Sequence, residues 1–404
     1  MSACLQSVYS GEKTRTEKGL CGMEQTLRRT WAEIDLDHLE HNFRTIRRQV
    51  GLKAGLLGVV KADAYGHGAV RVARKLQELG ASYLAISNLD EAEELRLHGV
   101  SLPILMLGYT PPEQTERILR LQVTQAVPNL EVARAYDEAA AKLGGRMTVH
   151  IKLDTGMGRL GFQCDEDHFD VSREEILSVL TLRHLDAEGV FTHFAVADED
   201  APEDIAFTET QHERFLHMID EVENRGGMRF RLHHCCNAGG IASHPEWAWD
   251  MVRCGIILYG TGALSEKLGM KPVMRFKTTV STIKEFEPGA PISYGCTWHT
   301  ERRSRIAVLA VGYADGLHRA LSNRLVVRTP YGNAPQVGRI CMDMCMIDAT
   351  ELPQLRSGDE VEIFGDHMPC EAAAEQCGTI SYELLCSVSQ RVPRLYFESG
   401  RQTP

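Results

Sequence analysis

The sequence predicts a two-domain protein in which a (β/α)8 barrel of the TIM type precedes a domain built mainly of β-strands. Between about residues 54 and 265, short apolar runs alternate with amphipathic segments of helical periodicity. After residue 270 the helical periodicity fades, and strand-like runs are separated by glycine and proline turns. A chain of 404 residues also exceeds what one hydrophobic core usually serves. We therefore expect a barrel over residues 26–270 and a β-domain over residues 271–404.

The first 25 residues are polar, mixed in charge and without clear periodicity, and we expect a flexible extension there. Order is expected to begin at residues 30–36, which alternate as a strand does, and to continue with a helix that ends near Gln49.

Eight apolar runs are candidates for the barrel strands. They span residues 54–61, 83–87, 104–107, 124–127, 148–153, 189–193, 231–234 and 255–259. The helical segments between them include residues 69–79, 89–98, 115–121, 130–143 and 208–225. Eight repeats at this spacing are typical of a closed barrel. A doubly wound open sheet is the alternative, because a miscount of one or two strands would change the closure.

The region after residue 270 contains six strand candidates and one helix. The strands are expected at 276–286, 305–311, 325–329, 334–339, 344–348 and 360–364, and the helix near 379–387.

Charge and composition exclude several classes of protein. A net charge of −11 argues against nucleic-acid binding and against an anionic membrane surface, since both partners attract surplus lysine and arginine. No apolar run approaches the roughly twenty residues that cross a bilayer. The 12 cysteines are scattered without zinc-type spacing, so we expect no metal site. Residues 1–22 lack the apolar core of a secretory leader, and we expect a cytoplasmic protein with reduced thiols.

Lys61 ends the first strongly apolar strand candidate and is the first candidate for chemistry. In a parallel barrel the carboxyl ends of the strands face the catalytic mouth. A buried lysine there favours the neutral amine that a Schiff base requires. Tyr65, Gly66 and Gly68 follow in a turn where glycines allow close approach of a ligand. Taken alone, Lys61 fits a surface lysine after a buried strand equally well.

The segment Lys61-Ala-Asp-Ala-Tyr-Gly-His-Gly68 closely resembles the cofactor-lysine motif of alanine racemases. The resemblance extends from about residue 30 to residue 396. Seven further segments match in the same order, at residues 152–159, 189–195, 253–256, 293–295, 311–316, 338–343 and 391–396. Eight ordered matches across both predicted domains are far more specific than any one of them.

The resemblance implies a fold-type III enzyme that carries pyridoxal phosphate on Lys61. Racemisation removes the α-proton from one face of the substrate aldimine and returns a proton to the other, which two acid–base groups do most directly. The resemblance assigns Lys61 to the D-enantiomer and Tyr294 to the L-enantiomer. Because a tyrosine hydroxyl is almost fully protonated at neutral pH, His193 and His234 are candidates to assist it by hydrogen bonding.

The resemblance also implies how the cofactor is held. Arg253, at the start of the last strand candidate, is expected to face the pyridine nitrogen with support from His234. The phosphate is expected to contact Tyr65, Tyr396 and the backbone N–H groups of Gly255 and Ile256. The segment His234-Cys-Cys-Asn237-Ala238 departs from the family, which commonly has serine after the asparagine. One hydroxyl contact is therefore expected to be missing beside Asn237, at a cost of about 1 kcal/mol.

For the substrate, the resemblance assigns Arg159 as the carboxylate clamp, since a planar guanidinium suits that partner. Lys152 corresponds to a lysine that is carbamylated in many relatives, and the carbamate would orient the arginine. Met342 and Asp343 are expected to complete the substrate site. Three residues are expected to narrow its entrance: Asp198, Tyr313 and Arg319. In the family, Tyr294 and Met342 act across the interface of a head-to-tail homodimer with shared active sites.

The function implied is interconversion of L- and D-alanine, which supplies D-alanine for peptidoglycan. A serine or broad-specificity racemase is the alternative. Tyr396 favours alanine, because a smaller polar residue would leave room for a hydroxyl. A pocket that distinguishes two substrates by one small group discriminates between them by only about 1–3 kcal/mol, so some turnover of serine is expected. A non-catalytic pyridoxal-phosphate carrier would lack the β-domain, and a decarboxylase of this architecture would leave Tyr294 unexplained.

Overall fold

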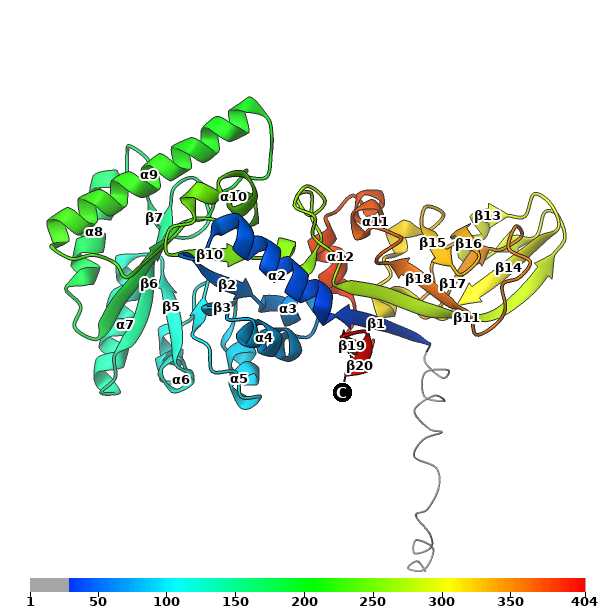
Figure 1. Ribbon diagram of the computed structural model, residues 1–404, viewed down its shortest axis with the longest axis horizontal. Coiled ribbons are helices and arrows are strands. Elements are labelled where there is room, and N and C mark those ends of the chain that lie inside the picture. The colour runs from blue at the N-terminus through cyan, green and yellow to red at the C-terminus, as the bar shows by residue number, and fades with distance from the viewer. Residues whose placement is uncertain (1–28, 404) are drawn as a thin grey trace, which may run out of the picture.

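The computed structural model describes residues 29–403, so the extension expected over residues 1–25 lies outside the described residues. Figure 1 shows two parts side by side. One is a ring of strands surrounded by helices, coloured blue to green, and the other is an elongated β-structure in yellow and orange. The expected sequence of a barrel followed by a mainly β domain is confirmed.

Eight parallel strands form a nearly closed barrel in the order β10-β2-β3-β4-β5-β6-β8-β9, and short β7 (Phe162–Gln163) pairs with β6. Their bounds are β2 Gly55–Val59, β3 Tyr83–Ile86, β4 Ile104–Met106, β5 Val123–Val127, β6 Met147–Asp154, β8 Leu185–Phe191, β9 Leu232–His234 and β10 Met251–Cys254. Hydrogen bonds from Asp250 N to His233 O (3.2 Å) and from Arg253 N to Cys236 O (3.0 Å) join β9 and β10, at the point where no regular ladder forms.

The helices that surround the barrel bury their apolar faces on it. They are α3 Lys61–Gly66, α4 Ala69–Glu78, α5 Leu89–Leu97, α6 Thr115–Leu121, α7 Leu130–Lys142, α8 Phe169–Leu180, α9 Pro202–Gly226 and α10 Ala238–Ser243. Side-chain caps define several of their starts: Asn88 and Glu91 form a capping box on α5, and Asn129 accepts the N–H of Val132 on α7.

The expected eighth strand at 255–259 is wrong. Residues Ile256–Tyr259 form the 3-10 helix η4, and the strand is β10, which ends at Cys254. The sequence of a short, fully buried apolar run does not distinguish a strand from a helix. Here Gly260, with a φ of 70°, ends the 3-10 helix. The difference moves Arg253 from the start of a strand to the carboxyl end of one. That is the end at which barrel side chains reach the mouth.

The β-domain is built on the long strand β11 (Met274–Phe286), which pairs with β1, β14 and β18. Its other strands are β1 Thr30–Asp35, β12 Pro291–Ile292, β13 Trp298–His299, β14 Ser304–Leu309, β15 Val326–Thr329, β16 Gly332–Pro335, β17 Cys345–Asp348, β18 Glu360–Phe364, β19 Arg394–Glu398 and β20 Arg401–Thr403. Its helices are α11 Cys370–Cys377 and α12 Ser381–Ser387, with short 3-10 turns η5 Tyr294–Cys296, η6 Tyr313–Asp315 and η7 Arg319–Leu321. Two further 3-10 turns, η2 Pro112–Gln114 and η3 Pro245–Trp247, belong to the barrel.

The two parts are tied together at both ends of the chain. Strand β1 lies between β11 and β19, so the first strand belongs to the β-domain sheet although it precedes the barrel. Helix α2 (Leu36–Val50) follows it, and the Asn42 side chain donates to Leu258 O at 3.0 Å and Lys271 O at 2.8 Å.

No helix within residues 29–403 is long and apolar enough to cross a membrane.

Candidate active site

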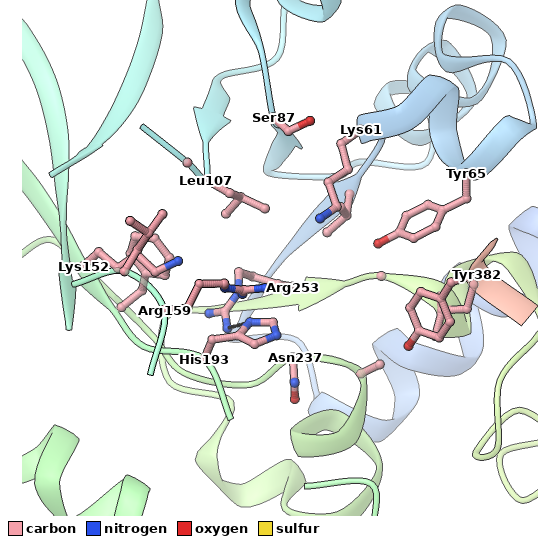
Figure 2. Close-up of a pocket in the computed structure, with 17 residues that line it drawn as sticks. Lys61, Tyr65, Ser87, Leu107, Lys152, Arg159, His193, Asn237, Arg253 and Tyr382 are labelled. Carbon is pink, nitrogen blue, oxygen red and sulfur yellow. Dashed lines mark hydrogen bonds between the residues drawn. The ribbon is translucent and has the colours of Figure 1, made fainter. Parts of the chain in front are cut away.

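A cavity of about 380 Å³ opens at the carboxyl ends of the barrel strands. Figure 2 shows its arrangement. Lys152 and Arg159 lie on one side, Tyr65 and Tyr382 lie on the other, and Lys61, Arg253 and His193 lie between them. The lining includes four cationic side chains and no carboxylate: the cations are Lys61, Lys152, Arg159 and Arg253. A cavity of this charge favours a ligand that carries at least two anionic groups.

Lys61 begins a short left-handed turn after β2. Four successive residues, Ala62, Asp63, Ala64 and Tyr65, have φ between 52° and 53°. This conformation costs roughly 1–2 kcal/mol for each residue with a side chain. Two hydrogen bonds hold it: Ala62 N donates to Glu91 Oε1 (2.7 Å), and Ala69 N donates to Asp63 Oδ1 (2.7 Å). The turn is therefore a strained, fixed support for the lysine.

The turn places the Tyr65 ring at the cavity wall. The ring packs against Tyr259, with centroids 5.0 Å apart, and Tyr259 donates its own hydroxyl to Val59 O at 2.7 Å. Burial raises the pKa of Tyr65, so its hydroxyl remains protonated and can donate. Gly255 faces this hydroxyl, because a Cβ built on Gly255 would lie 3.4 Å from Tyr65 Oη.

Arg253 is buried below the centre of the cavity and forms no ion pair with a carboxylate within the described chain. Its Nη2 donates to Thr192 O (2.7 Å) and to His193 Nδ1 (3.3 Å). Its Nη1 donates to His234 O at 3.0 Å and to Nδ1 of the same residue at 3.2 Å. Burial lowers the pKa of Arg253 to about 10, so the group stays charged at neutral pH.

Both histidines that accept from Arg253 are neutral. Burial is the main cause that lowers the pKa of His193, and the Arg253 charge adds to it. Burial also lowers the pKa of His234, well below the ordinary histidine value. A neutral imidazole has one nitrogen free to accept a hydrogen bond, and in each ring Nδ1 takes that part.

Lys152 and Arg159 form the other end of the cavity. Burial, and after it the charge of Arg159, lowers the pKa of Lys152 to about 8. The Lys152 amine also lies 5.2 Å from the centre of the Phe191 ring. Asp154 does not neutralise this pair directly. Its carboxylate accepts the backbone N–H of Arg159 at 2.8 Å and of Gly158 at 3.0 Å, which shapes the turn that presents the arginine.

Comparison with known proteins identifies this arrangement. A family model described as alanine racemase, N-terminal domain, matches residues 34–263, and a model of the alanine racemase C-terminal domain matches residues 273–396. The chain belongs to the alanine racemase family.

Relatives and solved structures agree with this assignment over nearly the whole chain. Alanine racemase of Desulforamulus reducens is 44% identical over 371 residues, which cover 91% of this chain and 98% of the relative. The structure of alanine racemase from Clostridium difficile 630 superposes with a TM-score of 0.88 at 39% identity, covering 94% of this chain and 98% of that one. The structure from Bacillus anthracis with bound L-Ala-P gives 0.84 at 32% identity, covering 93% and 97%.

The structure brings together most of the barrel residues expected from the family resemblance. Those that line the cavity are Lys61, Tyr65, Lys152, Arg159, His193, Asn237, Arg253, Gly255 and Ile256. His234 lies directly behind Arg253. Asp198 does not line the cavity, but its charge contributes to raising the pKa of Tyr382.

Five residues that were expected in the site lie on the β-domain and do not line the cavity: Tyr294, Tyr313, Arg319, Met342 and Asp343. Tyr294 is 71% exposed and Met342 is 54% exposed. Their turns are fastened to one another, since Tyr313 N donates to Cys341 O (3.0 Å) and Ser293 Oγ donates to Arg339 O (2.6 Å). We call the surface formed by the turns 293–296, 312–316 and 341–344 the β-platform.

Tyr396 is not part of the cavity, in contrast to the expectation from the family resemblance. Its hydroxyl donates to His67 O at 3.2 Å, and a Cβ at Gly68 would lie 1.8 Å from that hydroxyl. The residue packs behind the lysine turn because β19 runs beside β1, and its ring centre lies 4.9 Å from the Arg71 guanidinium of α4. The argument that Tyr396 selects alanine over serine therefore fails.

Sequence reasoning missed three residues that belong to the site or support it: Tyr382, His150 and Glu188. Tyr382 lines the cavity from α12. His150 lies two residues before Lys152 on β6, and this alternation of polar residues in a barrel strand was the available signal. Glu188 is a carboxylate within the run of β8 and carries the same signal.

Proposed function

We propose that this chain is an alanine racemase that interconverts L- and D-alanine with pyridoxal phosphate bound at Lys61. The observation that carries the proposal is the cavity lining, in which four cations face an enclosed space without any carboxylate. Pyridoxal phosphate with alanine presents a phosphate and a carboxylate. These are the two anionic groups that such a cavity would balance.

The residues present fit the cofactor from end to end. Tyr65 and the backbone at Gly255 and Ile256 would hold the phosphate. Arg253 would face the ring nitrogen as a donor, because its guanidinium stays protonated and its other N–H groups are already bound. Pyridoxal phosphate supplies an electron sink that makes the α-proton of an amino acid acidic.

The chain's own groups would then handle the proton and the carboxylate. Lys61 at the cavity centre would move the α-proton on one face, and Arg159 would bind the substrate carboxylate with a planar pair of N–H donors. His193 accepts from Arg253 and is held neutral by burial, so it is available to support the second acid–base group.

The second acid–base group in this proposal is Tyr294 of another copy of the chain. Within one chain Tyr294 lies on the β-platform and its side chain is mostly exposed. A head-to-tail homodimer would bring the β-platform of each copy to the barrel mouth of the other. Tyr294, Met342 and Asp343 would then complete the substrate site, and Asp198, Tyr313 and Arg319 would narrow its entrance. In the cytoplasm the product D-alanine would serve peptidoglycan synthesis.

The test is to follow solvent deuterium into Cα of L-alanine and of D-alanine, each with the wild type, Lys61→Ala and Tyr294→Phe. We expect Lys61→Ala to lose cofactor attachment. Tyr294→Phe should keep the cofactor and lose exchange selectively from L-alanine. Equal wild-type rates of exchange from both enantiomers in Tyr294→Phe would contradict the two-base assignment. Because Tyr396 does not select the substrate, turnover of serine beside alanine in the same assay decides between the narrow and broad forms of the proposal.

A further inference from the structure

Tyr294 lies in the loop of residues 293–297, which joins the paired strands β12 and β13. Its side chain is 71% exposed, and Gly295 and Cys296 beside it are also exposed. Side-chain burial within one chain therefore contributes little to the direction of the Tyr294 ring. The backbone of the loop sets that direction instead.

Ser293 has a backbone conformation that residues with a side chain rarely adopt. Its φ is 66° and its ψ is −177°, a combination found almost only in glycine. Gly295 with a φ of 72° and Cys296 with a φ of 46° follow, so the backbone turns sharply on both sides of Tyr294. A strained residue persists only where the surrounding contacts hold it, and such residues cluster at functional sites.

The segment of residues 338–339 holds Ser293 in this conformation. Ser293 Oγ donates to Arg339 O at 2.6 Å. A Cβ built on Gly338 would lie 2.9 Å from Ser293 Cβ, so the segment lies directly against the serine. One hydrogen bond and one close backbone contact therefore act on the strained residue from the same side.

This segment is itself held by the interior of the β-domain. The buried Gln336 side chain donates to Gly338 O at 2.8 Å. Arg339 then extends to the far side of the loop, where a Cβ on Gly295 would lie 2.9 Å from its Nη1. The segment therefore contacts the residues immediately before and after Tyr294.

We propose that Ser293 is a positioning residue for the racemisation, because its hydroxyl holds the strained backbone that presents the Tyr294 hydroxyl to the substrate. Without the hydrogen bond to Arg339 O, the serine would relax to a negative φ and the exposed tyrosine would lose its fixed direction. An acid–base group acts only within hydrogen-bond reach of the proton that it moves, so a small change of direction slows that step. This inference rests on the proposed function, in which Tyr294 serves the L-enantiomer.

The test measures solvent deuterium exchange into Cα of L-alanine and of D-alanine with Ser293→Ala, which removes the hydroxyl and keeps a side chain at the strained position. We expect exchange from L-alanine to slow by about tenfold or more. Exchange from D-alanine, which the proposed function assigns to Lys61, should change by less than about twofold. Ser304→Ala is the matched control, because Ser304 Oγ likewise donates to a backbone oxygen of the β-domain, Arg302 O at 2.8 Å. It should leave both rates unchanged.

Two further variants separate the positioning role from a structural one. Glycine adopts a φ of 66° without strain, so Ser293→Gly should retain more exchange from L-alanine than Ser293→Ala does. In the Tyr294→Phe background, Ser293→Ala should cause no further loss, because both changes act through the same hydroxyl. Sedimentation of each variant should show the same association as the wild type.

The inference is overturned if Ser293→Ala exchanges L-alanine as the wild type does, if it slows both enantiomers equally, or if it slows the Tyr294→Phe enzyme further. Loss of association in Ser293→Ala would also overturn it, since the effect would then belong to the contact between copies. Slower exchange from L-alanine in Ser293→Gly than in Ser293→Ala would rule out the role of strain. Wild-type exchange of both enantiomers in Tyr294→Phe would instead overturn the proposed function.

Discussion

His150 Nδ1 lies 2.9 Å from His234 Nε2, and this contact fixes the tautomer of both rings. Arg253 can only donate, so His234 Nδ1 accepts and its proton sits on Nε2. That proton is donated to His150 Nδ1, which leaves the His150 proton on Nε2, 3.3 Å from Glu188 Oε2. The buried guanidinium is thus joined through two neutral imidazoles to the carboxylate of Glu188 on β8.

Replacement of Glu188 by glutamine should make the folded protein less stable. The hydrogen bond from His150 is the main cause that lowers the pKa of Glu188 to about 2, and the Tyr83 hydroxyl also donates to it at 2.6 Å. Loss of a charge-assisted bond costs roughly 1.5–3 kcal/mol, and we expect Glu188→Gln to lower the free energy of unfolding in urea by about that amount.

The same variant should differ from the wild type in its dependence on pH. The pKa of Glu188 is lower in the folded chain than in the unfolded chain, so the ionised carboxylate stabilises the fold. This stabilisation is complete above about pH 4.5 and is lost as the pH falls toward 2. Asp186→Asn is the control on the same strand, since the ion pair of Asp186 with Arg231 is solvent-accessible and should contribute less than about 1 kcal/mol. Equal losses for the two variants would contradict the relay.

The buried ring of His67 should cause a second loss of stability, at a higher pH than the loss caused by protonation of Glu188. The ring is fully buried, its Nε2 has no partner within the described chain, and burial lowers its pKa to about 4. The unfolded chain binds a proton near pH 6.5 and the folded chain does not, so stability falls as the pH drops from about 6.5 to 4. Each such histidine contributes about 1.4 kcal/mol per pH unit. Plotted against pH over this range, the free energy of unfolding in urea should change less steeply for His67→Gln than for the wild type. For His299→Gln, which replaces an exposed histidine, the pH dependence should be that of the wild type.

Lys61 was predictable from the sequence because it ends the first strongly apolar strand candidate. The family resemblance added the other cationic residues of the cavity, Lys152 among them. Arg253 was found with the wrong local structure, since a buried apolar run hides the change from strand to 3-10 helix. Tyr382 was missed because α12 reaches the cavity only through tertiary contacts with Gly66, more than 300 residues away in sequence. Tyr396 was misplaced for the same reason.

Lys152 should take up carbon dioxide. Burial, aided by three neighbouring cations, lowers its pKa to about 8, so a useful fraction of the amine is neutral near pH 8. The amine nitrogen would bond to the carbon of carbon dioxide and release one proton, and the resulting anion would face Arg159. With isotope-labelled bicarbonate, carbon NMR should show a carbamate signal that grows as the pH rises toward 8. Lys152→Arg should remove that signal, and its persistence in this variant would place the modification elsewhere.

Asp315 holds the β-platform together, and its loss should be costly. The residue is 3% exposed. Its carboxylate accepts from Arg391 Nε at 2.8 Å, from Arg29 Nη2 at 3.1 Å and from Gly312 N at 2.9 Å. Arg391 also donates to Asp343 Oδ1 at 2.7 Å, so the network reaches the turn that carries Met342.

Asp315→Asn removes a buried carboxylate that accepts from two half-exposed arginines, and we expect it to lower the free energy of unfolding by about 1.5 kcal/mol. The variant should also lose association of two copies, measured by sedimentation, because the turns that carry Tyr294 and Met342 would no longer be fixed. Asp366→Asn is the matched control: it removes a partner of Arg275, which retains Glu33 and Asp35, so its effect should stay below about 1 kcal/mol. If Asp315→Asn unfolded earlier but associated as the wild type does, the β-platform would not be the surface that joins the copies.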